Sequence, residues 1–229
     1  YKDRLDASSI LNESFTRQFP QKQVRAYSDL YDDAIKLMKS KDLEAFDLTH
    51  EPEALREEYG QNNFGQGCLL ARRLIENKVR FVEVSYGGWD MHNDVFGGLE
   101  NKAKVLDDGL STLLSDLDRR GMLADTMVVV ASEFGRTPEI KAGRVGRDHH
   151  PSCFSGWLAG GGIKGGMHYG KTDDFSYNVV ENPVRVRDLH ATMLHLLGVN
   201  HEHLTFPFQG LDQKLTGVEK ARVVTDILS

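Results

Sequence analysis

Two short polar clusters contain the residue types that most often bind a divalent metal ion. Asp90 and His92 lie two residues apart just after an apolar run, and Asp148, His149 and His150 follow one another in a later stretch. In an extended backbone, residues two apart point to the same side. Carboxylate and imidazole donors together suit an ion such as zinc or manganese. Three adjacent donors exceed what one ion takes from neighbouring positions, so we expect one histidine to bind metal and the other to orient a substrate or a ligand.

Three further charged residues either follow the second predicted strand or directly precede Asp148. Glu133 suits a metal ligand, a general base or an ion-pair partner of Arg136. Arg136 and Arg147 suit two-point binding of an anionic group, and ordinary surface ion pairs are the alternative for both. Each polar cluster alone also fits a surface loop or a helix cap. Because the clusters follow neighbouring predicted strands, we predict a metal or substrate site.

The first third of the chain contains only helical patterns, so we predict a helical region over residues 1–78. Helical spacing of apolar residues recurs further along the chain, where Gly121 and Gly198 are well placed to end helices. The predicted helices cover residues 27–40, 51–60, 64–78, 99–120 and 186–197.

Strand patterns begin after residue 78. Residues 79–86 and 126–132 are rich in β-branched side chains and predict two strands, and residues 154–159 predict a third. Strand, helix and strand in succession predict a parallel βαβ unit, whose strands end at the edge of the sheet where ligands bind. We therefore predict an α/β fold, a mainly parallel sheet sandwiched by helices. Residues 79–229 would form its C-terminal part, with more sheet expected before residue 1.

The composition excludes several classes of partner. The chain has 229 residues, a formal net charge of −6 and no long basic run, so we expect no binding to nucleic acid. No apolar run approaches the ~20 residues that span a membrane. The two cysteines, Cys68 and Cys153, lie among apolar residues and predict buried free thiols. No signal peptide is visible, but the chain starts at Tyr1 rather than at a methionine, so the sequence leaves the cellular compartment open.

The order of the polar motifs resembles domain-of-unknown-function family 1501, which is grouped with the sulfatases in the alkaline-phosphatase superfamily. The likeness also includes Tyr59 to Leu74 and Arg187 to Leu194, and so spans nearly the whole chain. The motifs that carry it are Gly87-Gly88-Trp89-Asp90-x-His92, Ser132-Glu133-Phe134-Gly135-Arg136-Thr137-Pro138 and Gly146-Arg147-Asp148-His149-His150-Pro151.

This resemblance implies a metal-dependent hydrolase of sulfate or phosphate esters. It assigns Asp90, His92 and either His149 or His150 to one metal site, with zinc, manganese or calcium as the ion. Phe134 stands where the superfamily has a histidine ligand, which implies that a second metal site is altered or lost. The substrate would be an anionic small-molecule or polysaccharide ester. The nucleophile is expected before residue 1, and a periplasmic or secreted location is implied.

Two other interpretations remain open. A non-catalytic member of the same fold would keep the site as a binding or structural module. A nucleotide-binding α/β protein would use the glycine run at 160–166 as an anion-binding nest, although a tight turn fits this run equally well. His190, with Asp188 at the start of the last predicted helix, is a weaker site candidate.

Overall fold

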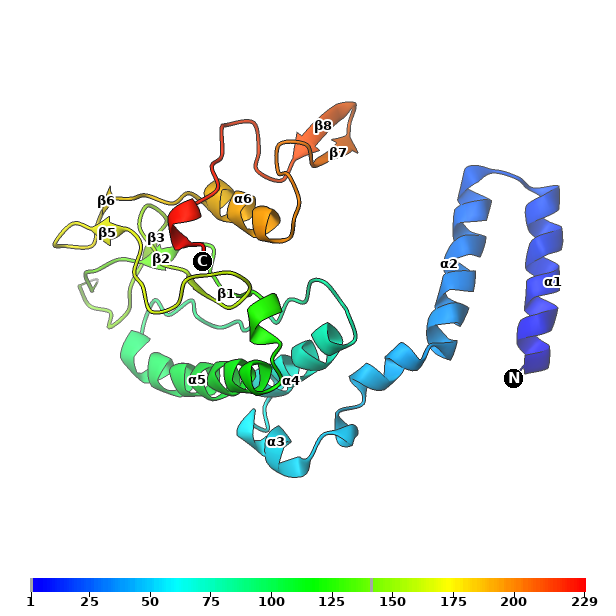
Figure 1. Ribbon diagram of the computed structural model, residues 1–229, viewed down its shortest axis with the longest axis horizontal. Helices are drawn as coiled ribbons and strands as arrows, with labels where there is room; N and C mark the ends of the chain where they lie inside the picture. Colours follow the sequence, from blue (N-terminus) through cyan, green and yellow to red (C-terminus); the bar gives the residue numbers. More distant parts are fainter. Residues whose placement is uncertain (1, 141) are drawn as a thin grey trace. The chain divides into compact units, whose positions relative to one another are not determined.

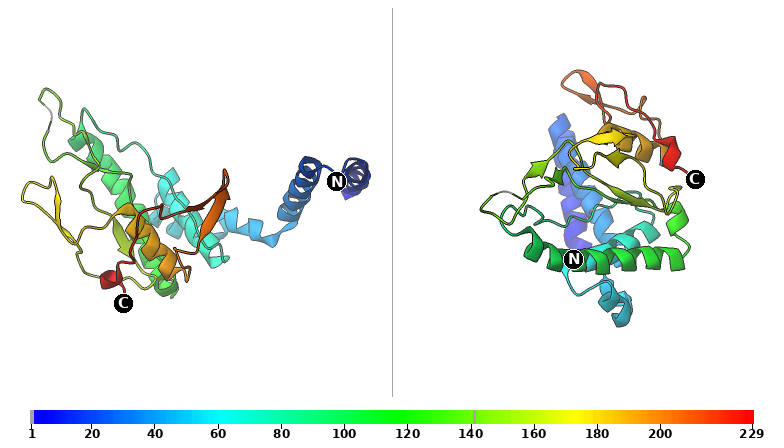
Figure 2. Two further views of the ribbon diagram at one scale, coloured as in Figure 1. Left: turned by 90° about the horizontal axis from the view of Figure 1, so that it is seen from above. Right: turned by 90° about the vertical axis from the view of Figure 1, so that its left-hand side faces the viewer.

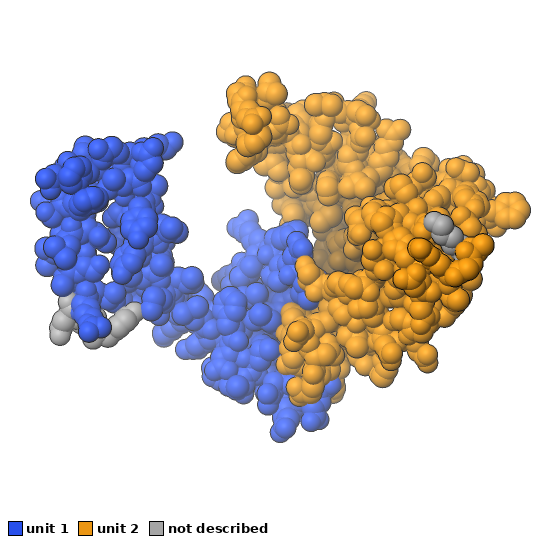
Figure 3. Space-filling model, turned by 180° about the vertical axis from the view of Figure 1, so that it is seen from behind, with its two compact units in different colours: residues 1–57, 69–84 blue, residues 58–68, 85–229 orange. Residues whose placement is uncertain are grey.

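The computed structural model describes residues 2–140 and 142–229, and the chain divides into two compact units (Figure 3). Unit 1 contains the described residues up to Glu57 together with Leu69–Val84, and unit 2 contains Glu58–Cys68 and Ser85–Ser229. None of the described helices combines the length and the apolar composition that crossing a membrane requires. Both cysteines are free thiols, as predicted, but only Cys68 is buried, and Cys153 is half-buried. Burial raises the pKa of the Cys68 thiol to about 12.

Unit 1 begins with an antiparallel pair of helices, α1 (Lys2–Gln18) and α2 (Lys22–Lys39) (Figure 1). The apolar stripe of α2 is exposed along its length, at Tyr27, Leu30 and Leu37 for example. Two short 3-10 helices, η1 (Lys41–Phe46) and η2 (Leu48–His50), lead to α3 (Glu53–Glu58). The chain then continues into α4 (Asn63–Glu76).

The second half of α4 supplies most of the buried residues described in unit 1. Leu69 is 0% exposed. The side chain of Arg72 is also fully buried, and its guanidinium lies 2.7 Å from Glu51 and 2.6 Å from Glu76. Arg73 donates to the carbonyl oxygen of Ala45 at 2.8 Å. A buried charge is tolerated only when it is paired, so these contacts allow two arginines on the inner side of a short helix.

Two helices of unit 2 lie on opposite sides of its first strands, and the last two strands lie beyond the second of these helices (Figures 1 and 2). One is α5 (Val95–Arg119), whose N-cap residue Asp94 accepts from the amide of Gly97 at 3.0 Å. The other is α6 (Val186–Leu196). Buried Tyr59 donates its hydroxyl to Asp116 of α5 at 3.0 Å. The short helices η3 (Leu123–Asp125) and η4 (Thr225–Ile227) complete the helical part.

The strands of unit 2 are short and form two-stranded antiparallel sheets. Each strand has a single neighbour among the described residues. The pairs are β1 (Val128–Val130) with β4 (Trp157–Ala159), β2 (Gly135–Arg136) with β3 (His149–His150), β5 (Lys171–Thr172) with β6 (Val179–Glu181), and β7 (Thr205–Phe208) with β8 (Leu211–Lys214).

The predicted α/β fold with a mainly parallel sheet is therefore wrong. Residues 79–86 form no strand, so the predicted βαβ unit is absent from the described chain. The strand predicted at 126–132 exists as β1, but it pairs antiparallel with β4 and is half-buried rather than fully buried. β-branched residues favour any extended, partly buried segment, and their pattern does not determine the partner or its direction. The protein is a mixed structure of helices and small antiparallel sheets.

Candidate metal site

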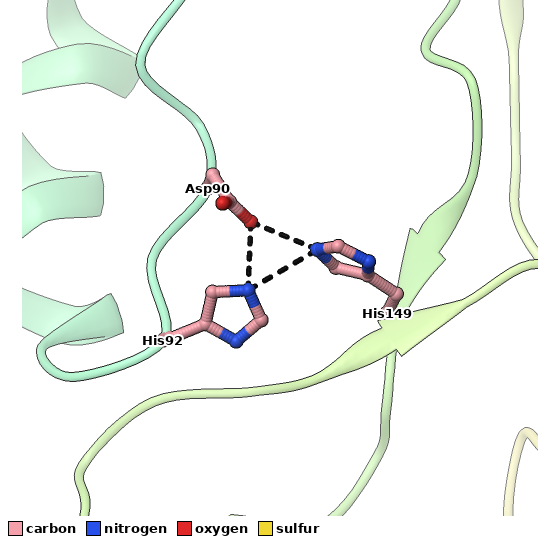
Figure 4. Close-up of side chains that lie close together, drawn as sticks. All are labelled: Asp90, His92 and His149. Atoms are coloured by element: carbon pink, nitrogen blue, oxygen red, sulfur yellow. Dashed lines mark hydrogen bonds and ion pairs between the residues drawn. The ribbon is translucent and has the colours of Figure 1, made fainter.

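Three side chains of unit 2 converge on one point of its surface (Figure 4). Asp90 Oδ1 lies 2.9 Å from His92 Nε2 and 3.0 Å from His149 Nε2. The two Nε2 atoms are 3.1 Å apart. The side chains are 65%, 31% and 46% exposed, in the order Asp90, His92 and His149. We call these three residues the Asp–His–His cluster.

An aromatic stack holds the loop that carries Asp90 and His92. The rings of Phe64 and Tyr86 stack at 4.7 Å, and Trp89 meets Tyr86 edge-on at 5.4 Å. The indole of Trp89 donates to the carbonyl oxygen of Tyr86 at 2.7 Å, which closes the turn. Lys102 of α5 lies over the Tyr86 ring and donates to the carbonyl oxygen of Gly87 at 2.8 Å. The loop is thus fixed from both sides immediately before Asp90.

The β2–β3 ladder brings His149 to the cluster. Arg136 is directly opposite His149, so the two side chains lie on the same face of the pair. Gly135 is opposite His150, whose side chain lies on the other face. A side chain at Gly135 would come within 2.7 Å of the Cys153 carbonyl oxygen and within 2.9 Å of Phe154. The glycine therefore allows β2 to lie close to the segment that follows β3.

A second glycine joins the two halves of the cluster. The backbone at Gly146 runs so close to that of His92 that a Cβ there would overlap the His92 carbonyl group. Next to it, the amide of Val95 donates to the carbonyl oxygen of Val145 at 2.9 Å. Only a residue without a side chain permits this approach. Gly146 thereby lets the loop before β3 lie against the loop that carries Asp90 and His92.

Asp148 orients one of the imidazoles. Its Oδ1 lies 3.3 Å from His92 Nδ1, on the side of the ring opposite the cluster. When Nδ1 carries the proton, as this contact favours, Nε2 presents its lone pair to Asp90 and His149. A carboxylate behind a histidine in this manner is the usual support of a metal-binding imidazole. The sequence predicted Asp148 as a ligand, but the structure places it behind His92.

Arg136 controls the charge of Asp90. Its Nη2 donates to Asp90 Oδ1 at 2.6 Å. The hydrogen bond from Arg136, followed by that from His149, lowers the pKa of Asp90 to about 2. The carboxylate is therefore ionised at any ordinary pH, as a metal ligand must be.

The other predicted site residues lie outside the cluster. Arg147 donates to the carbonyl oxygens of Thr137, at 2.7 Å, and of Pro138, so it holds the backbone of the segment after β2. Glu133 is exposed and has no hydrogen bond or ion pair with the described part of the chain. His150 lies against Tyr177, and its Nε2 is 2.9 Å from the Tyr177 carbonyl oxygen. Of the two adjacent histidines, His149 is the one that reaches Asp90 and His92.

Several residues that shape the site were not predicted from the sequence. Phe134 packs its ring on His149 at 4.3 Å, so this residue supports an imidazole although it cannot bind metal itself. The hydroxyl of Tyr177 donates to Glu139 at 2.5 Å and holds the β5–β6 hairpin to the segment after β2. Gly146 was recognised as part of a motif, but only the close approach of two loops shows why it is a glycine.

The residues of two weaker site candidates make hydrogen bonds within unit 2. The glycine run after β4 begins as a tight turn, because Ile163 donates to the carbonyl oxygen of Gly160 at 3.0 Å and Gly161 donates to that of Leu123 at 2.9 Å. These two amides are thus used within the protein. Asp188 is buried and accepts from the backbone amide of Arg222 at 2.9 Å, which ties the C-terminal segment to α6.

The donor set of the Asp–His–His cluster fits a divalent ion. Ligand atoms bonded to one ion at about 2.0–2.2 Å are separated by roughly 2.8–3.6 Å. The three separations in the cluster fall in this range. With the His92 proton on Nδ1, the lone pairs of Asp90 Oδ1 and His92 Nε2 face each other at 2.9 Å. A shared cation stabilises such an arrangement, whereas hydrogen bonds alone cannot satisfy all three contacts.

Comparison with known proteins assigns the chain to a family but not to an activity. No curated protein and no solved structure gave a significant match. One family, described as protein of unknown function (DUF1501), matches residues 1–228, which is nearly the whole chain. The chain therefore belongs to this family of proteins of unknown function.

Proposed function

We propose that the Asp–His–His cluster binds one divalent metal ion and that the protein is a metal-dependent hydrolase of sulfate or phosphate esters, related to the sulfatases of the alkaline-phosphatase superfamily. One observation carries this proposal: three donors, two from one loop and one from strand β3, converge within 3.1 Å, and one imidazole is oriented by Asp148. A histidine that binds metal almost always donates its other ring N–H to a carboxylate, a backbone carbonyl or a water, and Asp148 offers His92 such a partner.

The donor set also indicates which ion is bound. Two imidazole nitrogens and one carboxylate oxygen suit zinc or manganese. Calcium takes six to eight oxygen ligands and is disfavoured by two nitrogen donors. We therefore propose zinc or manganese.

Each neighbouring side chain has a definite role in this proposal. A bound ion would polarise the ester oxygen and stabilise the negative charge that develops on the oxygens in the transition state. Asp90, His92 and His149 hold the ion, and the exposed face of the cluster is open to a substrate. Arg136 lies beside the cluster, hydrogen-bonded to Asp90, and is proposed to contact the anionic group of the substrate. Glu133 is proposed as a further base or ligand, because it is exposed on the same segment as Phe134.

Metal analysis of two histidine variants tests the proposal. We expect mass spectrometry of the purified protein to find about one zinc or manganese ion per chain. His149→Ala should abolish binding, while the matched control His150→Ala, one residue along the same strand, should retain it. Asp90→Ala should remove both the ion and any ester hydrolysis. Metal-free wild-type protein, or loss of metal in His150→Ala alone, would contradict the assignment.

A non-catalytic function of the same cluster is the second candidate, and Phe134 favours it. Its ring occupies the position that the resemblance assigns to a histidine ligand and packs on His149 instead. A phenyl ring binds no metal, so the cluster would hold one ion where the superfamily holds two. In that case the protein would bind metal and an anionic small-molecule or polysaccharide ester without cleaving it. Wild-type protein that binds metal but hydrolyses no sulfate or phosphate ester would support this alternative.

A further inference from the structure

One oxygen atom of the cluster has more partners than it can serve at once. Asp90 Oδ1 lies 2.6 Å from Arg136 Nη2, 2.9 Å from His92 Nε2 and 3.0 Å from His149 Nε2. An sp² carboxylate oxygen has two lone pairs. The guanidinium therefore lies on the same atom that would bind the metal ion.

We propose that Arg136 and the metal ion compete for Asp90 Oδ1, so that metal binding releases the guanidinium to take an anionic group of the substrate. This inference rests on the proposed metal site. Arg136 already neutralises Asp90 and so acts as an internal cation. A divalent ion at the same oxygen repels the guanidinium, because two like charges within a few ångströms disfavour each other. The short ion pair is then broken or weakened.

The released side chain stays beside the cluster. β2 fixes the backbone of Arg136 opposite His149, and the side chain is only 23% exposed. Its second nitrogen, Nη1, donates to the carbonyl oxygen of Arg147 at 3.3 Å, a long bond that restrains the group only weakly. The planar guanidinium then presents parallel N–H donors to an anion, the geometry that binds sulfate or phosphate oxygens in pairs.

This exchange makes the metal and the anion bind cooperatively. If the metal frees Arg136, then an anion held by Arg136 removes the competitor of the metal, and each ligand tightens the binding of the other by the same factor. The contrasting interpretation is that Arg136 only orients Asp90. Loss of such a supporting group weakens metal binding by roughly 10–100-fold. The two interpretations therefore predict opposite signs for the same substitution.

Zinc titrations with and without sulfate distinguish competition by Arg136 from a role in which Arg136 only orients Asp90. In wild-type protein, we expect millimolar sulfate to tighten zinc binding by about 5-fold or more, measured by isothermal titration calorimetry with a competing chelator. Arg136→Gln should bind zinc more tightly than wild type without sulfate and should lose the sulfate effect. Arg136→Lys, which retains the charge without the planar fork, should keep near wild-type zinc affinity but respond less to sulfate.

A matched control variant shows whether the effect is specific to Arg136, and two separate outcomes would overturn the metal site or the competition. Arg144→Gln makes the same charge change at an exposed position with no interaction in the described part of the chain, and it should behave as wild type. Wild-type protein that binds no zinc would overturn the proposed metal site, and this inference with it. If wild-type protein binds zinc but Arg136→Gln binds it equally or more weakly, or still responds to sulfate, only the competition is overturned. Circular dichroism confirms that each variant is folded.

Discussion

The close approach of Gly146 to His92 makes Gly146→Ala the most direct test of how the cluster is assembled. A Cβ at position 146 would overlap the carbon and oxygen of the His92 carbonyl group, whereas ordinary contacts lie at 3.4–4 Å. Backbone cannot rotate away as a flexible side chain can. The loop before β3 must therefore withdraw from the loop that carries His92 by more than about 1 Å.

The cost of this displacement follows from the contacts that join the two loops. The amide of Val95 donates to the carbonyl oxygen of Val145 at 2.9 Å, and the amide of Arg147 donates to that of Met91 at 3.3 Å. Each such bond contributes about 0.5–1.5 kcal/mol net, and overpacking costs typically 1–3 kcal/mol. We expect Gly146→Ala to lower the free energy of unfolding by about 2–4 kcal/mol.

Metal affinity should fall as well, because metal–ligand distances tolerate only about ±0.2 Å. A loss of roughly 10-fold or more is expected, in line with other disturbances of a metal-binding shell. Urea denaturation gives the stability, and zinc titration gives the affinity. Gly165→Ala is the control, since its Cβ would meet open space, and it should change both quantities little. If Gly146→Ala matched Gly165→Ala in both assays, our account of the joined loops would be refuted.

Three further predictions concern the supporting contacts. Asp148→Ala removes the acceptor behind His92 and should weaken zinc binding by roughly 10–100-fold in the same titration; unchanged affinity would show that the imidazole needs no support. Leu69→Ala empties a fully buried position and should lower the free energy of unfolding by about 2–5 kcal/mol in urea, and a change under 0.5 kcal/mol would contradict its burial. The hydrogen bond between Tyr177 and Glu139 raises the pKa of the tyrosine and lowers that of the glutamate. The extra stability of wild type over Tyr177→Phe should therefore be constant between about pH 4.5 and 10, the ordinary pKa values of the two groups. It should be lost as the pH falls through the lowered pKa of Glu139 or rises through the raised pKa of Tyr177; a pH-independent difference would exclude the contact.

Local patterns predicted the helices well. The apolar spacing at 64–78, 99–120 and 186–197 corresponds to α4, α5 and α6 within a few residues. A helix is determined mainly by contacts three and four residues apart, which the sequence displays directly. The strands at 126–132 and 154–159 were located correctly, as β1 and β4, but their pairing with each other and its antiparallel direction were not predicted. Strand pairing depends on residues far apart in the chain, and no local pattern encodes it.

The candidate site was also predicted from the sequence only in part. Asp90 and His92 were identified from their types and spacing, because both belong to one loop. The choice of His149 over His150 required the register in which Gly135 opposes His150. Arg147 was predicted to bind an anion, but its guanidinium holds backbone carbonyls that only the fold brings near. Residue types therefore indicated the candidate donors, and the pairing of β2 with β3 determines which of them lie together.

The ladder of β2 and β3 is only two residues long, so the alignment of these strands depends on few contacts. So short a pair makes few hydrogen bonds, and a slip of one residue turns every side chain to the opposite face. After such a slip His150, not His149, would be opposite Arg136 on the face that meets Asp90. The assignment of His149 rather than His150 to the cluster therefore depends on this one alignment, and a substitution that shifts the register of β2 and β3 should exchange the two histidines.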